Sequence, residues 1–285
     1  MDKQTQVRRA EAFRALHHAP KLLVLPNIWD PLGARLLEHL GYPAVATASA
    51  AVAYSLGYDD GQRIRFDVML EVIERIAASV SIPLSADIEG GYAESPRELG
   101  DNVRRVLQAG AVGINLEDSI AEGGPLREID AQCARIRAAR AAAVREGIPL
   151  VINARTDVFL SEPAGSEDDR VATAGARARA YVESGADCIY PILLDDVAAL
   201  TSLRRATGAP INVLARAGTP PMRRLEAAGI SRLSLGPGLI KSSLAAMEGV
   251  ARELLDYGTY DRFTSQAMSS ERIAQFVRRE RMPRE

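Results

Sequence analysis

The chain has 285 residues and a mass of 30.7 kDa, with 47% hydrophobic residues and a mean hydropathy of −0.06. This composition is typical of a globular protein with room for one large domain or two small ones. Its 35 basic and 37 acidic residues give a net charge of −2, which disfavours nucleic acid as a partner. No apolar run approaches the ~18 residues of a membrane span, and the first residues lack the apolar core of a signal peptide. We therefore expect a cytoplasmic enzyme or binding domain that has no membrane partner.

The rare residue types argue against several kinds of chemistry. The three histidines all lie within the first 39 residues, away from the later polar clusters. Histidine is the commonest general base and zinc ligand, so Ser-His-Asp chemistry and zinc hydrolysis are disfavoured. The two cysteines, Cys133 and Cys188, have neither metal-ligand nor disulfide spacing. Carboxylates and arginines remain as the candidate chemical groups.

Short apolar runs alternate with longer amphipathic stretches along the chain. The runs lack polar alternation, which is typical of parallel strands buried on both faces. We predict eight strands, at residues 22–26, 44–48, 83–87, 112–117, 149–154, 187–191, 211–214 and 232–235. We predict helices between and after them, at residues 31–40, 67–79, 95–109, 129–146, 167–184, 197–207, 220–228 and 238–256.

Several predicted helices end at a glycine directly before the next strand. These glycines, which suit a left-handed helix C-cap, are Gly41, Gly110, Gly147, Gly185 and Gly229. Eight strand–helix units in series favour an α/β fold, a (β/α)8 TIM-type barrel over residues 1–256 that includes a short N-terminal helix. A doubly wound open sheet is disfavoured because no Gly-x-Gly-x-x-Gly follows the first strand. Residues 257–285, with a helix at 270–281, form a candidate C-terminal helical arm for oligomerisation.

Acidic residues gather where two consecutive strands end. Asp87 and Glu89 follow one strand, and Glu117 and Asp118 follow the next. Strands that are consecutive in a barrel are neighbours, so these carboxylates would crowd one rim and repel each other. A divalent cation would relieve this repulsion, and ligands that are all oxygen favour Mg²⁺, with Mn²⁺ possible, over zinc.

Arg155 directly follows the fifth predicted strand, and continued alternation places it on the same face as Asn153. A guanidinium beside a metal can bind a carboxylate through two hydrogen bonds, which suggests a small anionic ligand. The alternative is a salt bridge between Arg155 and Glu117 at the rim. At the last strand end, Gly236-Pro237-Gly238 is either a phosphate site or, more simply, a glycine turn before a helix.

Five segments of the chain follow one another in an order and spacing that resembles the isocitrate lyase/phosphoenolpyruvate mutase superfamily. They are "LPNIWDPLGARLLEHLGYPAVATASAAVAYSLGYDDG", "PLSADIEGGY", "AGAVGINLEDS", "VINARTDVF" and "YVESGADCIY". The resemblance runs from about Leu22 to Leu255. It implies a Mg²⁺-dependent barrel that binds 2-oxo or 2-hydroxy carboxylates and passes through an enolate. It also implies a homo-oligomer, a tetramer with a swapped C-terminal helix, although a dimer remains an alternative.

The resemblance also implies roles for individual residues. Asp87 would bind Mg²⁺ directly, Glu117 would reach it through water, and Glu89 would replace an acid that this chain lacks at Ser85. We assign catalytic roles to Arg155, Asp60 and Glu89. The residues expected to bind substrate are Trp29, Ala48, Ser49, Ala50, Arg155 and Asn212.

The chain also departs from the family pattern. The lid after the Glu117-Asp118 pair lacks the lysine, cysteine and histidine of the lyases and the Lys and Thr-Asn of the mutases. A missing general acid costs about 10²–10⁴ in rate, which argues against efficient isocitrate or methylisocitrate cleavage. We therefore expect a carbon–carbon lyase, retro-aldol or decarboxylating, that uses metal and Arg155 to stabilise an enolate. The alternatives are a phosphonopyruvate-type carbon–phosphorus hydrolase or mutase and a non-catalytic binder of 2-oxo acids.

Overall fold

The strands form a closed parallel barrel in the computed structural model, which describes residues 1–121, 123–161 and 166–277. They are β1 (Leu23–Leu25), β2 (Asn27–Ile28), β3 (Val45–Thr47), β4 (Leu84–Asp87), β5 (Gly113–Glu117), β6 (Val151–Thr156), β7 (Cys188–Pro191), β8 (Asn212–Leu214) and β9 (Arg232–Ser234). They pair in parallel in the orders β2-β3-β4-β5-β6-β7 and β1-β9-β8. A bridge between Ile189 and Ile211 connects β7 to the start of β8 and completes the ring. The predicted barrel is therefore confirmed.

The first predicted strand is divided at Pro26. Proline has no backbone N–H, so it cannot donate to a strand ladder. β1 lies before Pro26 and pairs with β9, whereas β2 lies after it and pairs with β3. Pro26 still accepts a hydrogen bond from the backbone N–H of Ala46, at 3.0 Å. The two halves of one predicted strand therefore pair with different neighbouring strands of the barrel.

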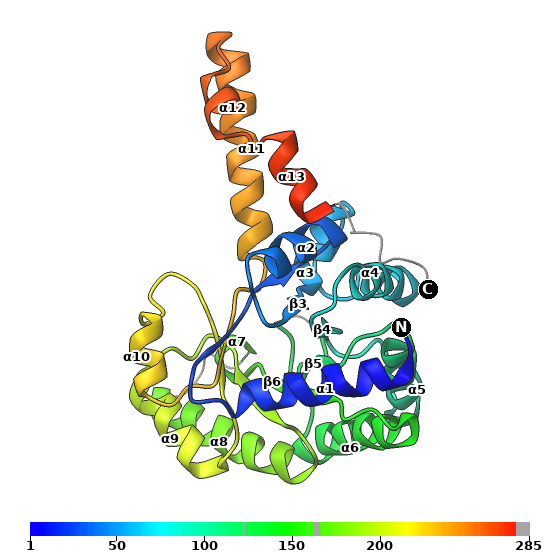
Figure 1. The fold of residues 1–285 in the computed structure, drawn as a ribbon. Helices are drawn as coiled ribbons and strands as arrows, with labels where there is room; N and C mark the ends of the chain where they lie inside the picture. Colours follow the sequence, from blue (N-terminus) through cyan, green and yellow to red (C-terminus); the bar gives the residue numbers. More distant parts are fainter. Residues whose placement is uncertain (122, 162–165, 278–285) are drawn as a thin grey trace.

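Helices cover the outside of the barrel (Figure 1). The eight predicted helices are α2 (Pro31–His39), α4 (Phe66–Ser79), α5 (Pro96–Gln108), α6 (Ile129–Glu146), α8 (Glu167–Glu183), α9 (Val197–Thr207), α10 (Met222–Ala227) and α11 (Gly238–Tyr257). The described residues also form α1 (Lys3–His17), α3 (Ser49–Ser55), α7 (Val158–Ser161), α12 (Asp261–Gln266) and α13 (Ser270–Val277). No helix among the described residues is long and apolar enough to cross a membrane.

Local sequence signals set the ends of these helices. Ser95 caps α5 in a reciprocal arrangement with Glu98, in which each side chain accepts a hydrogen bond from the other residue's backbone N–H. All five glycines predicted as stop signals have positive φ, as at Gly147, where φ is +62°. These caps satisfy backbone groups that would otherwise lack partners at the helix ends.

Helix α1 packs against the barrel beneath the strands. Phe13 on α1 is fully buried, and a Cβ atom added at Gly113 of β5 would lie only 2.6 Å from the Phe13 ring. The same Cβ would lie 2.9 Å from Oγ of Ser85. Glycine at this position therefore allows α1 to pack closely, while the opposite ends of the strands stay available for a site.

The C-terminal helices extend away from the barrel. Figure 1 shows α11 and α12 projecting outward and α13 turning back toward α2. Only Ile240 is buried on α11, and no residue of α12 or α13 is buried. The backbone oxygen of Val277 accepts a hydrogen bond from Arg35 on α2, at 2.7 Å. The predicted helix at 270–281 is present to Val277, and its last four positions lie outside the described residues.

Candidate active site

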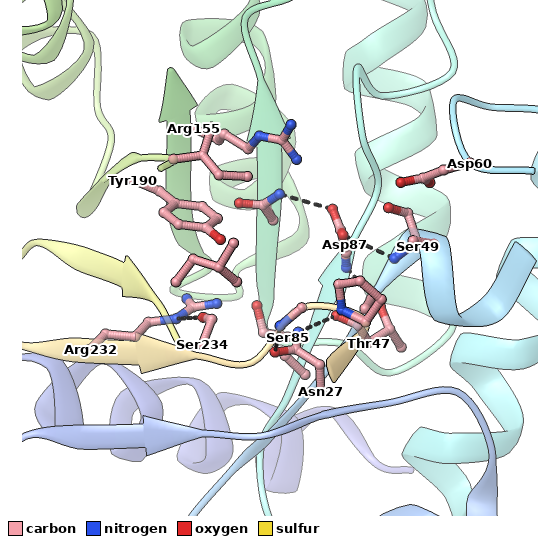
Figure 2. A pocket seen from close by; sticks show the side chains of 18 of the residues that line it. Asn27, Thr47, Ser49, Asp60, Ser85, Asp87, Arg155, Tyr190, Arg232 and Ser234 are labelled. Atoms are coloured by element: carbon pink, nitrogen blue, oxygen red, sulfur yellow. Dashed lines mark hydrogen bonds between the residues drawn. The ribbon is translucent and has the colours of Figure 1, made fainter. Parts of the chain in front are cut away.

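A cavity of about 220 Å³ opens among the carboxyl ends of the strands. In such barrels the loops at these ends build the active site. The volume is below the ~300–1,000 Å³ typical of pockets for drug-sized ligands, so it suits a small molecule. Figure 2 shows Asp87, Arg155, Tyr190 and Arg232 around it. Its polar lining residues are Asn27, Thr47, Ser49, Tyr54, Asp60, Ser85, Asp87, Asn115, Arg155, Tyr190, Arg232, Ser234 and Lys241.

Several polar contacts fix Asp87 at the wall of this cavity. Its Oδ2 accepts a hydrogen bond from the backbone N–H of Ser49 at 3.0 Å. Its Oδ1 accepts one from Nδ2 of Asn115 at 2.9 Å, and its own N–H donates to Oγ1 of Thr47 at 2.8 Å. The carboxylate is therefore held in one orientation before any ligand binds.

A row of amides continues this arrangement across the neighbouring strands. Asp87, Asn115 and Asn153 lie in register on β4, β5 and β6. Nδ2 of Asn153 donates to Oδ1 of Asn115 at 2.9 Å, and this leaves the Asn115 amide nitrogen facing Asp87. The sequence analysis did not assign Asn115, although strand alternation places it on the same face as Glu117.

Arg155 contacts two carboxylates and also lines the cavity. Its Nη1 lies 2.6 Å from Oε1 of Glu117, and its Nε lies 2.5 Å from Oδ1 of Asp157. Asp157 is fully buried and accepts a further hydrogen bond from Oγ of Ser119 at 2.6 Å. Burial lowers the pKa of Arg155, but Glu117 and Asp157 outweigh it and hold that pKa above its ordinary value. Arg155 therefore forms the predicted salt bridge with Glu117 and also lines the cavity.

Glu89 lies in a small side cavity of about 20 Å³, together with Asp60, Glu117 and Arg155. Its carboxylate accepts hydrogen bonds from the backbone N–H of Gln62 at 2.5 Å and from the hydroxyl of Tyr92 at 3.0 Å. Burial and the nearby charges of Asp87 and Asp60 raise the pKa of Glu89 to about 8. Burial likewise raises the pKa of Glu117, although Arg155 opposes this shift. Asp60 and Arg155 line both cavities.

The donor set fits a hard divalent cation better than a soft one. All the acidic groups around the two cavities supply oxygen, and burial together with the charges of Asp87 and Asp60 raises the pKa of Glu89. Within residues 1–121, 123–161 and 166–277, no group of three or more acidic, histidine or cysteine side chains is close enough to enclose an ion. Mg²⁺ tolerates this arrangement because it usually keeps several waters and takes one or two carboxylates. Asp87 is held by hydrogen bonds from Ser49 and Asn115 and is open to the main cavity.

The remaining predicted site residues divide into those beside the cavity and those away from it. Ala48, Ser49 and Ala50 form part of its wall. Trp29 packs on Ala48 and Ile240 and is not a lining residue. Asn212 is fully buried, accepts a hydrogen bond from Ser234 at 3.0 Å and is also outside the lining.

Two other strand-end signals have structural explanations. Asp118 accepts hydrogen bonds from the Tyr181 hydroxyl at 2.7 Å and from the backbone N–H of Asp157 at 2.9 Å, so it connects to α8. At the Gly236 turn, Oδ1 of Asn27 accepts hydrogen bonds from the N–H groups of Leu235 and Gly236, at 2.8 and 2.9 Å. These contacts favour a simple glycine turn before α11 over a phosphate site.

Sequence reasoning missed Tyr190 and Arg232, which come from β7 and β9 and line the cavity. Tyr190 lies at a strand end that was identified, but a tyrosine in an apolar run gives little signal. Arg232 stands at the start of a strand, away from the carboxyl end where barrel sites are sought. A charged residue at the start of a buried strand was the signal that could have found it.

Comparison with known proteins identifies the family of the chain. The family model described as phosphoenolpyruvate phosphomutase matches residues 13–255. An uncharacterized protein of Mycobacterium tuberculosis is 32% identical over 246 residues, which cover 86% of this chain and 89% of that protein. A 2-methylisocitrate lyase of Vibrio cholerae is 27% identical over 278 residues, covering 92% and 86% respectively.

Among solved structures, a Burkholderia cenocepacia protein provisionally assigned as a lyase/mutase superposes with a TM-score of 0.88. It is 35% identical, and the match covers 96% of this chain and 97% of that one. The family match extends across the whole barrel, from α1 to α11, and so includes every strand that contributes to the cavity. The chain therefore belongs to the isocitrate lyase/phosphoenolpyruvate mutase superfamily of lyases and mutases.

Proposed function

We propose that this protein is a Mg²⁺-dependent carbon–carbon lyase of a small 2-oxo or 2-hydroxy carboxylate. The observation that carries the proposal is the presence of Asp87 and Arg155 on one cavity of about 220 Å³. A fixed carboxylate supplies a cation site, and a buried guanidinium supplies donors for an anionic oxygen. Together they suit a small acid whose reaction develops negative charge on oxygen.

The ion would be held by Asp87 directly and by Glu117 through water, with Asp60 nearby and with Glu89 ionising when the charge of the cation opposes its raised pKa. When bound, Mg²⁺ would act as a Lewis acid that polarises the 2-oxo or 2-hydroxy oxygen of the substrate. The carboxylate, amide and hydroxyl oxygens that line the cavity around Asp87 support this assignment.

The protein's own groups would position the substrate and stabilise its enolate. Arg155 is preorganised by Glu117 and Asp157, so its guanidinium needs little rearrangement when charge develops on the substrate oxygen. In a decarboxylation, the carbon–carbon bond to the leaving carboxylate breaks, its electron pair forms the enolate, and CO₂ departs. Burial raises the pKa of Tyr190, so its phenol stays protonated and can donate to an oxygen in the cavity.

The lid after β5 favours this chemistry over the lyase reactions that need a thiol acid. Ser119 pairs with Leu126, and the N–H of Ile120 donates to the Pro125 carbonyl at 2.9 Å. Within the described part of the chain, neither cysteine nor histidine lines the cavity. Decarboxylation needs no acid to cleave the bond, whereas a retro-aldol cleavage would need a base, for which Glu89 and Asp60 are the candidates.

Two alternatives use the same cavity. A phosphonopyruvate-type carbon–phosphorus hydrolase or mutase would place a phosphonate near the arginines, and the family match to phosphoenolpyruvate phosphomutase favours including it. A binder of 2-oxo acids without catalysis would keep Asp87 and Arg155 and dispense with the lid acid.

A substrate panel tests these possibilities. Release of pyruvate or glyoxylate would be measured from oxaloacetate, isocitrate, 2-methylisocitrate and phosphonopyruvate, with Mg²⁺ and with EDTA. We expect Mg²⁺-dependent release from one of the carboxylates. Turnover of phosphonopyruvate alone would support the carbon–phosphorus alternative, and Mg²⁺-dependent binding without any turnover would support the binder.

We also propose that the projecting helices join copies of this chain into a homo-oligomer. α11 exposes Leu255 and Tyr257 at 85% and 79% of their surfaces, and α12 exposes Phe263 at 58%. Large apolar side chains gathered on one projection are a common mark of a protein–protein interface. A second copy would offer the same projection, because most soluble homo-oligomers are symmetric.

A further inference from the structure

Arg232 is a buried cation at the deep end of the cavity. Its residue surface is 2% exposed, and it lies at the first position of β9, whereas Arg155 lies near the end of β6. Its Nε donates to Oγ of Ser234 at 3.2 Å, and its Nη1 is buried without a hydrogen-bond partner. No carboxylate among the described residues forms a salt bridge with it. Figure 2 shows its guanidinium beside Ser234, on the side of the cavity where Tyr190 lies.

The groups around Arg232 do not neutralise it. Burial lowers the pKa of His17 to about 3 and raises the pKa of Cys188 to about 12, so both side chains are uncharged at neutral pH. Burial also raises the pKa of Tyr190. Asp87 is the carboxylate whose charge acts on Arg232, and it is already engaged by Ser49 and Asn115.

A buried charge without a partner is costly, because the charge has lost its hydration and gained no compensating interaction. An anionic group entering the cavity would supply that compensation through the free guanidinium donors. Arginine presents these donors in a planar fork that matches carboxylate and phosphonate oxygens. The unpaired Nη1 and the cavity in front of it therefore point to a ligand rather than to packing alone.

We infer that Arg232, with Ser234 and Tyr190 beside it, binds a second anionic group of the substrate, a carboxylate or a phosphonate. The substrate then has two anionic ends, one toward Asp87 and Arg155 and the other toward Arg232. The inference rests on the proposed function for the placement of the reacting end, but the anion subsite itself rests on Arg232 and the cavity. It makes Arg232 a specificity residue that selects diacids over monoacids.

Calorimetric binding of two stable acids tests this inference. (S)-Malate and (S)-2-hydroxybutyrate share the 2-hydroxy acid group, and malate has a carboxylate where 2-hydroxybutyrate has a methyl group. In the presence of Mg²⁺, we expect malate to bind the wild-type protein about 10- to 100-fold more tightly. Arg232→Gln should reduce that ratio to about threefold or less, mainly by weakening malate.

A matched control separates this effect from a general change of charge. Arg216 pairs with Asp195 on the surface and does not line the cavity, so Arg216→Gln removes one positive charge and should keep the wild-type ratio between the two acids. Arg232→Lys keeps the charge and loses the fork, and it should give an intermediate ratio even if Arg232→Gln does not fold. An unchanged ratio in both Arg232 variants, or no preference in the wild-type protein, would overturn the inference.

One further pair of ligands and the results of the substrate panel complete the test. Succinate and 3-phosphonopropionate differ in one end group, and the tighter ligand of the pair identifies the anion that the subsite prefers. If Arg232→Gln loses the preference for malate over 2-hydroxybutyrate and the wild-type protein turns over no substrate in the panel, the anion subsite is upheld and the lyase function is rejected. Turnover of a substrate in the panel with the same kcat/KM in wild type and Arg232→Gln would uphold catalysis and reject the subsite.

Discussion

Arg155 and Glu117 lie directly opposite each other on adjacent strands, and Nη1 of Arg155 is 2.6 Å from Oε1 of Glu117. The same guanidinium contacts Asp157, so two carboxylates fix its plane at the edge of the cavity. Because lysine has no such fork, Arg155→Lys should lower kcat/KM by about 10²–10³, the scale of losing an oxyanion donor. Steady-state kinetics with the substrate found in the panel would measure this.

Arg216→Lys is a suitable control for that experiment, because Arg216 forms an arginine–aspartate pair with Asp195 at 2.6 Å on the exposed surface. Its effect on kcat/KM should be small. If the Arg155 variant retained wild-type kcat/KM, Arg155 would have no role beyond the structure of the rim.

Asp87 should determine metal-dependent ligand binding. Its carboxylate is the acidic group that the hydrogen bonds from Ser49 and Asn115 hold at the cavity wall. Asp87→Ala should abolish Mg²⁺-dependent binding of oxalate, whereas Asp195→Asn on the surface should leave it intact. Titration calorimetry with and without EDTA checks this expectation. Undiminished binding in the Asp87 variant would remove the metal assignment.

Cys133 should be dispensable for catalysis. Its side chain is buried between α6 and α8, with Sγ 3.4 Å from the Ala180 carbonyl, and it does not line the cavity. Cys133→Ser should therefore leave kcat/KM nearly unchanged when thermal unfolding shows that the fold is retained. A loss of about a hundredfold or more, the scale of a lost general acid, would mean that Cys133 takes part in the reaction.

His17 should make the protein less stable in mild acid. Burial and the charge of Arg232 lower the pKa of His17 to about 3, whereas the unfolded chain takes up this proton near pH 6.5. Between those pH values the unfolded state binds the extra proton, so the free energy of unfolding falls as pH falls below 6.5. From pH 7 to pH 5 this contribution is about 2 kcal/mol.

Urea unfolding across this pH range measures the effect. His17→Met should remove most of this pH dependence, because methionine fills a similar space without titrating. His18→Gln, at the exposed neighbouring position, should keep the wild-type slope. Equal slopes for His17→Met and the wild-type protein would show that His17 is protonated in the folded state.

The projecting helices should determine the oligomeric state. Light scattering coupled to size exclusion should give a dimer or tetramer for the wild-type protein, and Leu255→Glu should shift it toward monomer. Val144→Glu makes the same kind of change at a residue that is 70% exposed on α6, and it should not alter the mass. A monomeric wild-type protein, or a Leu255 variant with the wild-type mass, would contradict the proposed role of the arm.

The sequence by itself determined the order of strands and helices, because apolar runs, capping residues and stop glycines such as Gly147 act over a few neighbouring positions. It also predicted Asp87, Glu117 and Arg155 as candidate site residues, since these polar residues interrupt apolar strands at the ends where barrels bind ligands. The order and spacing of the sequence motifs also indicated the superfamily to which the chain belongs.

Tertiary structure decided what those side chains contact. Whether Glu89 faces the main cavity or a side cavity depends on Gln62 and Tyr92, and no local pattern specifies those contacts. The position of Arg232 beside Ser234 and on the same cavity as Tyr190 likewise depends on how the ring closes, which brings together strands distant in sequence. Side-chain direction follows from local periodicity, whereas partners, burial and the resulting pKa shifts arise only when the barrel is complete.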